Sequence, residues 1–289
     1  MGFGFQVLVS SLQSVFSDLQ DCEGCMPYDL RVVLVGLAAG YLSGQFGVGG
    51  GIVTTPGIRI LLGRSELISL GTPLLAIIPT VASGAYVYSK KGLIDNELIF
   101  PLVVSGIIGI VFGSLATVLV SAHLLMLLTA FIILILGLRF MAVQIEGVEQ
   151  HIQQITFGNP VERRNASFLI GLGCGFFSGF LGLGGGILLV PSLNLLLRQN
   201  LKKAFGTSLI VIAFYAVPGS IIHLFLGHID LKLAMLLILG TIPGAYVGAK
   251  TTVHLSESFL KSLFGLFLIA MAVYFIYFEI ISIMLKIAI

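Results

Sequence analysis

The chain is poor in charged residues. Asp, Glu, Lys and Arg together make up only 10% of its 289 residues, whereas about a quarter of the residues in soluble globular domains are charged. The net charge of +2 is small and spread along the chain, which argues against nucleic acid as a partner. Hydrophobic residues make up 57% of the chain, and its mean hydropathy is +1.09. This composition predicts an all-α polytopic membrane protein that is surrounded by the lipid bilayer.

Cysteine and the common catalytic motifs are also scarce. Of three cysteines, Cys22 and Cys25 form a CxxC before the first apolar run, and Cys174 lies inside a glycine-rich segment. No second CxxC completes a zinc site, and the chain lacks an HExxH motif or paired carboxylates. We therefore expect no enzyme, no metal site and no cofactor. An intramembrane redox protein that uses the CxxC stays open as an alternative.

Basic residues are missing from the N-terminal segment, where Arg31 is the first. A secretory signal peptide begins with a positively charged region, so we do not expect one here. Instead, apolar side chains recur at helical spacing: Phe3, Val7, Leu8, Leu12, Val15, Phe16 and Leu19. This pattern predicts that residues 1–29 form an amphipathic segment at the membrane surface.

Glycine, by contrast, is plentiful, and it marks an internal duplication. The stretch GLAAGYLSGQFGVGGGIVTTP, Gly36 to Pro56, occurs again as GLGCGFFSGFLGLGGGILLVP, Gly171 to Pro191. Matched residues lie 135 positions apart without a gap, and the same offset pairs Gly71 and Thr72 with Gly206 and Thr207, and Ile94 and Asp95 with Ile229 and Asp230. We therefore predict one repeat over 30–143, a linker over 144–165 and a second repeat over 166–289.

The glycine runs interrupt segments that are otherwise apolar enough to enter a bilayer. Glycine frees backbone polar groups that lipid cannot satisfy, so a break at 44–51 must be buried in protein or face water. If each segment enters, breaks and returns, each repeat has one re-entrant helix hairpin plus about three transmembrane helices, and the repeats are inverted. Lys and Arg then divide five against ten between the two sides. We expect this arrangement, with the richer side cytoplasmic and the protein in the cell (inner or plasma) membrane; eight spans with parallel repeats are the alternative.

Paired helix breaks also predict an anion site. Where a helix restarts after three glycines, its first N–H groups have no intrahelical partner and its dipole places partial positive charge there. Gly36, Gly40, Gly171 and Gly175 are instead expected to let helices pack closely. Our candidate substrate-binding residues are the glycine runs with nearby hydroxyl and amide side chains: Ser43, Gln45, Gly49, Gly50, Gly51, Thr72, Ser178, Gly184, Gly185, Gly186 and Thr207.

The pattern GxxxGxxSGxxGxGGGxxxxP, present in both halves, resembles the TauE/SafE family of sulfite exporters and related organosulfur-anion permeases. The resemblance covers roughly Gly36 to Ile276. It implies a permease or exporter of small sulfur-containing oxyanions such as sulfite, sulfonates or sulfoacetate. An anion channel, whose rates would exceed those of a carrier, is an alternative within the same broad class.

Overall fold

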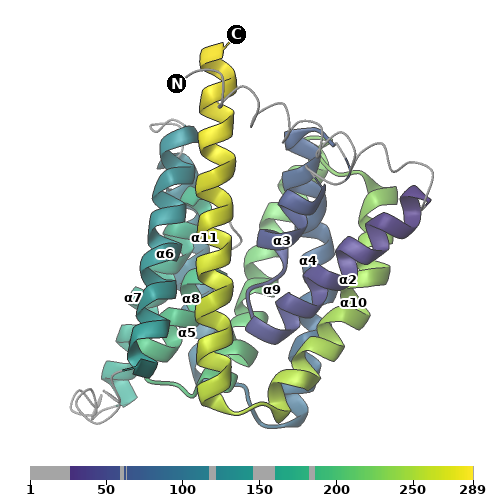
Figure 1. Ribbon diagram of the computed structural model, residues 1–289. Coiled ribbons are helices and arrows are strands. Elements are labelled where there is room, and N and C mark those ends of the chain that lie inside the picture. Colours follow the sequence, from purple (N-terminus) through teal and green to yellow (C-terminus); the bar gives the residue numbers. More distant parts are fainter. Residues whose placement is uncertain are drawn as a thin grey trace.

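The fold is entirely helical in the part of the chain that the computed structural model describes, residues 27–58, 62, 64–116, 122–145, 160–181 and 186–288. The predicted surface segment 1–29 and the linker 144–165 therefore lie largely outside it. The helices, shown in Figure 1, are α2 (Tyr28–Phe46), α3 (Gly51–Pro56), α4 (Glu66–Lys90), α5 (Asn96–Ala116), α6 (Ala122–Ile145), α7 (Pro160–Leu181), α8 (Gly186–Leu195), α9 (Leu201–Phe225), α10 (Leu231–His254) and α11 (Glu257–Ala288).

Several helices are long and apolar enough to cross a membrane. Among the described residues, five such segments occur: Leu67–Lys90, Asn96–Gly113, Leu201–Phe225, Leu231–His254 and Glu257–Tyr277. Large apolar side chains also point outward, as Phe100, Leu115 and Met235 do at 76%, 65% and 63% exposure. Such a surface suits lipid rather than water. The prediction of an all-α, multi-pass membrane protein is confirmed.

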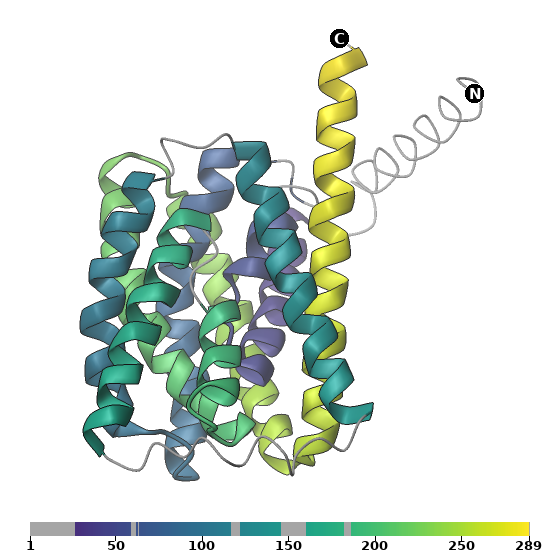
Figure 2. The same cartoon turned by 90° about the vertical axis from the view of Figure 1, so that its left-hand side faces the viewer.

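The helices correspond in pairs at the offset seen in the sequence. Adding 135 residues takes α2 onto α7, α3 onto α8, α4 onto α9, α5 onto α10 and α6 onto α11. Figure 2 shows the long helices standing side by side, with α11 extending beyond the rest. Each half of the chain thus builds the same order of helices.

Close packing crosses between the two halves. α2 of the first half packs on α10 of the second, and their equivalents α7 and α5 pack on each other in the same way. A Cβ atom at Gly36 would lie 2.6 Å from the Leu237 carbonyl oxygen, and one at Gly171 would lie 2.7 Å from the equivalent oxygen of Leu102. Only glycine lets the two backbones come this close. The packing role expected for these glycines is confirmed.

The order of these contacts also fixes the direction of the helices. Gly36 of α2 contacts Leu237 of α10, and Gly40, four residues later, contacts Thr241, also four residues later. The two helices α2 and α10 therefore run parallel. α4 and α9 run in opposite directions instead, because the start of α9 at Gly206 lies against Tyr88 near the end of α4.

An aromatic cluster holds the end of α2 in place. The Phe46 ring lies 6.3 Å from that of Phe205 on α9 and 5.5 Å from that of Phe264 on α11, measured between centroids. The Phe205 and Phe264 rings are also 5.5 Å apart. All three side chains are buried. Burial and edge-to-face contacts of this kind stabilise the point where α2 stops.

Candidate functional site at the glycine breaks

The first break is enforced by backbone conformation. α2 ends with Gly47 in the left-handed region at φ 66°, and the Gly47 N–H donates to the Ser43 carbonyl at 2.8 Å. Gly49 and Gly50 follow at φ 83° and 75°. Residues with a Cβ rarely adopt this conformation, so three glycines in four positions end the helix and turn the chain.

After the break the chain returns along α2. A Cβ at Gly50 would lie 3.4 Å from the Ser43 Cβ, whereas one at Gly57, seven residues later, would lie 2.7 Å from a methyl group of Val35. The chain after the break therefore moves back towards the start of α2. Every residue from Ser43 to Gly50 is buried, so the turn lies inside the protein.

Hydroxyl groups from three helices satisfy the carbonyls that the break leaves free. Tyr88 on α4 donates to the Gly44 oxygen at 2.9 Å, Thr252 on α10 to the Gln45 oxygen at 3.0 Å, and Ser208 on α9 to the Gly47 oxygen at 2.8 Å. Helix ends in an apolar medium need such partners. Tyr88, Ser208 and Thr252 could not be identified from the sequence, because no neighbouring residue marks them as partners of a distant helix end.

The N–H side of the same break is not satisfied in this way. α3 begins at Gly51, and among the described residues no side chain caps its N-terminus. The Ser43 hydroxyl lies beside this helix start, 3.6 Å from where a Gly50 Cβ would be, and it is fully buried without a hydrogen-bond partner in the described part of the chain. Buried polar groups are normally paired, so this point favours a polar ligand.

The second break meets the first. Gly186 begins α8, and a Cβ there would lie 2.6 Å from the Val48 Cα in the first break. A Cβ at Gly51 would lie 3.1 Å from Ile77, and one at Gly49 2.8 Å from Ile212. Ile77 and Ile212 are equivalent positions at the middle of the 25-residue helices α4 and α9. The breaks therefore come together about halfway along the molecule.

Some of the predicted site residues gather at this meeting point and others do not. Ser43, Gly49, Gly50, Gly51 and Gly186 lie there, and Gln45 and Ser178 are buried near the ends of α2 and α7. Gly184 and Gly185 lie outside the described residues. The Thr72 hydroxyl accepts the Asp230 N–H at 3.2 Å, and the Thr207 hydroxyl accepts the Asp95 N–H at 2.9 Å. Both hydroxyls thus hold loops, and a role for them in anion binding stays a prediction.

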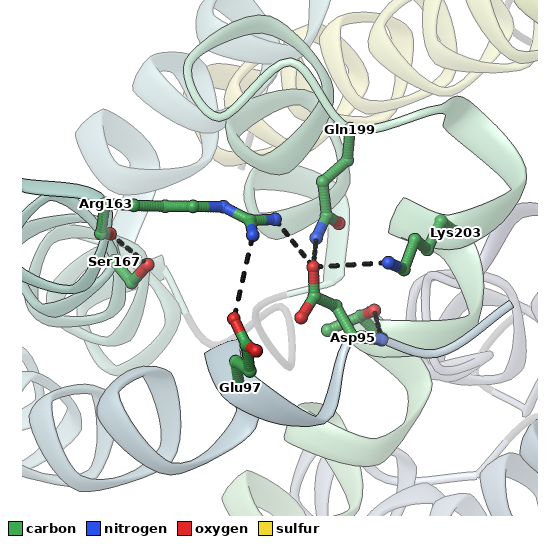
Figure 3. Close-up of polar contacts among 7 residues, drawn as sticks. Asp95, Glu97, Arg163, Ser167, Gln199 and Lys203 are labelled. Atoms are coloured by element: carbon green, nitrogen blue, oxygen red, sulfur yellow. Dashed lines mark hydrogen bonds and ion pairs between the residues drawn. The ribbon is translucent and has the colours of Figure 1, made fainter. Parts of the chain in front are cut away.

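A charged cluster surrounds Asp95, in the loop between α4 and α5 (Figure 3). One carboxylate oxygen, Oδ2, lies 2.6 Å from Arg163 on α7, 2.8 Å from the Gln199 amide nitrogen and 3.5 Å from the Lys203 ammonium on α9. Asp95 is only 5% exposed. With Thr207, these residues form what we term the Asp95 cluster. It joins the first repeat, which supplies Asp95, to the second half of the chain, which supplies the other members.

An equivalent but looser cluster surrounds Asp230. The Arg64 guanidinium lies 3.8 Å from the Asp230 carboxylate and donates to the Tyr28 hydroxyl at 3.0 Å. With Thr72 these form the Asp230 cluster, and each member stands 135 residues from a member of the Asp95 cluster. The repeated Ile-Asp pair was the signal in the sequence for both clusters. The charged and amide partners were missed because they come from the other half of the chain.

Comparison with known proteins agrees with this architecture. The family model described as sulfite exporter TauE/SafE matches residues 32–275. The chain is 30% identical over 240 residues to the probable membrane transporter protein YdhB of Bacillus subtilis, covering 81% of this chain and 94% of the relative. It is 28% identical over 249 residues to a probable membrane transporter protein of Xylella fastidiosa, covering 84% and 92%. No solved structure matches the chain.

Proposed function

Since the chain belongs to the TauE/SafE family of sulfite exporters, a family of membrane transporters, we propose that it carries small sulfur-containing anions such as sulfite, sulfonates or sulfoacetate across the cell (inner or plasma) membrane. The observation that carries the anion site is the pairing of the uncapped start of α3, which is half-buried at Gly51, with the buried hydroxyl of Ser43, which has no hydrogen-bond partner in the described part of the chain. Both groups donate hydrogen bonds, so an oxyanion is the ligand that suits them.

The chemistry of the site follows from the two helix starts. The N–H groups at Gly51 and Gly186 carry partial positive charge, and glycine lets an anion approach them closely. The breaks contain no Lys or Arg, so the anion is held by dipoles rather than by a full charge. Binding of this kind is strong enough for selection and weak enough for release, as transport requires. We include Ser43, Gln45 and Gly49 to Gly51 in the site, with Ser178 and Gly184 to Gly186 from the second repeat.

We further propose that the repeats are inverted and that each glycine break is re-entrant. Three observations support this arrangement. α4 and its equivalent α9 run in opposite directions, α2 of the first repeat runs parallel to α10 of the second, and the chain turns back on itself after Gly47. Transporters built this way hold their substrate where the repeats meet and move it by rocking one repeat against the other.

Ligand binding and flux together test the proposed function. We expect sulfite, thiosulfate, sulfoacetate or taurine to raise the thermal stability of the purified protein, since a ligand of the folded state stabilises it. Sulfate and chloride are the comparison anions. The stabilising anion should also enter proteoliposomes with saturable kinetics. Flux that does not saturate would favour a channel, and stabilisation by none of the anions would count against the site.

Substitutions at two glycines distinguish anion binding at the helix break from a general effect of added bulk. Gly51 does not need a left-handed conformation, and a Cβ there meets only the tip of Ile77, so Gly51→Val adds bulk at the helix start with little strain. Gly173→Val, on α7, adds the same bulk where nothing lies within 4 Å. We expect the first variant to lose anion binding and transport and the second to keep both. Equal behaviour of the two variants would reject the site.

A further inference from the structure

The Asp95 and Asp230 clusters lie at opposite ends of the molecule. Asp95 follows the end of α4, and Asp230 follows the end of α9, and these two helices run in opposite directions. Each helix has 25 residues, which corresponds to a length of about 37 Å. The site at the glycine breaks lies between the two clusters, at the middle of the same helices.

The two clusters occupy equivalent positions but differ in strength. Asp95 is 5% exposed and has three donors on one carboxylate oxygen, at 2.6, 2.8 and 3.5 Å. The Asp230 side chain is 26% exposed and meets one cation of the other half at 3.8 Å; its further partner, the Leu233 N–H at 3.0 Å, belongs to its own helix α10. The difference follows from the sequence, because Tyr28, Arg64 and Ile68 stand where the Asp95 cluster has Arg163, Gln199 and Lys203.

Because of this difference, separating the repeats costs more free energy at the Asp95 end than at the Asp230 end. Moving the repeats apart at the Asp95 end would strip a buried carboxylate of all its partners, which is strongly destabilising. The Arg64 and Asp230 side chains are 40% and 26% exposed, and ion pairs that water reaches contribute little to stability. Gln199 supports the same view, since its amide nitrogen bonds Asp95 while its buried oxygen has no partner in the described part of the chain. The orientation of the Gln199 side chain thus makes the hydrogen bond to Asp95 and leaves the amide oxygen without one.

We propose that the Asp95 cluster is a latch that keeps its end of the transporter closed in this structure, and that the Asp230 cluster is the weaker latch of the opposite entrance. The two repeats are equivalent and rock against each other, so a movement that separates them at one end brings them together at the other. Release of one latch therefore accompanies closure of the other. By the division of Lys and Arg, the Asp95 latch faces the cytoplasm. This inference rests on the transport function proposed above.

Distances between spin labels at the two ends test the latch without measuring transport. One label pair replaces Lys91 and Arg164, which are exposed residues of opposite halves of the chain at the Asp95 end. The second pair replaces the equivalent residues at the far end, Leu226 and Asp29, also exposed. Labels are attached to cysteines in a background in which Cys22, Cys25 and Cys174 are replaced by alanine. Double electron–electron resonance then reports both distances in the full-length protein.

We expect Asp95→Asn to populate a longer Lys91 to Arg164 distance and, at the same time, a shorter Leu226 to Asp29 distance. Arg163→Gln should act in the same direction and provides a second variant if the first does not fold. Asp230→Asn, the matched control, should leave both distances close to those of the parent protein. The shorter Leu226 to Asp29 distance is the decisive result. If the Asp95 cluster only anchored a loop, its loss would lengthen the Lys91 to Arg164 distance and leave the other unchanged.

Two results would overturn the latch. One is a change confined to the Asp95 end, and the other is unchanged distances in both variants while each remains folded by size-exclusion chromatography. Transport assays on the parent protein keep this outcome apart from the proposed function. Unchanged distances in a protein that transports reject the latch alone, whereas reciprocal distances in a protein that moves none of the tested anions reject the proposed substrates and leave the movement that the latch controls.

Discussion

Two buried serines face the first glycine break and differ in a way that assigns them different roles. The Ser208 hydroxyl donates to the Gly47 carbonyl at 2.8 Å, so it satisfies a helix end. The Ser43 hydroxyl is equally buried but has no partner in the described part of the chain. A satisfied group contributes to stability, whereas an unsatisfied one is a cost that a ligand removes.

We expect Ser43→Ala and Ser208→Ala to separate binding from stability. Ser43→Ala should leave the unfolding free energy unchanged or slightly raised while anion affinity falls about tenfold or more, since a hydrogen bond to a charged group contributes about 1.5–3 kcal/mol. Ser208→Ala should lower stability by about 1 kcal/mol and leave affinity nearly unchanged. Thermal unfolding with and without the anion measures both. Loss of stability in Ser43→Ala with intact affinity would contradict the assignment.

At this scale, the sequence predicted the role of residues whose function is local. The break at the glycine run was predicted from residue type, and the positive φ values of Gly49 and Gly50 that make it are values that glycine adopts without strain. Thr72 and Thr207 were harder to interpret, because their hydroxyls bond the backbone at Asp230 and Asp95, over 100 residues away. Nothing in the local pattern identifies a partner so distant.

At the scale of elements, α7 carries two glycines that test the packing between repeats. A Cβ at Gly175 would lie 2.6 Å from the Gly106 Cα on α5, whereas a Cβ at Gly173 would have nothing within 4 Å. We expect Gly175→Val to lower the unfolding free energy by about 1–3 kcal/mol, the usual cost of overpacking, and Gly173→Val to have little effect. Heating followed by size-exclusion chromatography compares them, and equal melting temperatures would argue against close packing of α5 on α7.

The order of the helices could be derived from the repeat, but their neighbours could not. An offset that holds without a gap implies that α2 and α7, or α4 and α9, have the same surroundings. It does not say whether α2 packs within its own repeat or on α10 of the other. That choice depends on which glycine faces meet across the whole bundle, which is a property of tertiary packing and not of spacing.

At the scale of the whole molecule, the positions of two equivalent loops distinguish inverted from parallel repeats. Lys91 and Leu226 are 135 residues apart and both are exposed. In the inverted arrangement we expect a cysteine at Lys91 to react with an impermeant maleimide only from the cytoplasmic side, and one at Leu226 only from the outside. Labelling of intact cells against inside-out vesicles gives the answer. Reaction of both from the same side would establish parallel repeats.

The packing of α2 on α10 and of α5 on α7 has a consequence for the origin of the protein. A single repeat carries two glycine faces but cannot cover either one with its own helices, because the covering helix belongs to the other repeat. If the repeats are inverted as proposed, a unit of this kind on its own would need a second copy of itself, inserted in the membrane the other way up, to cover these faces. The internal contacts of this chain would then correspond to the interface of a homodimer whose two subunits are joined in one polypeptide.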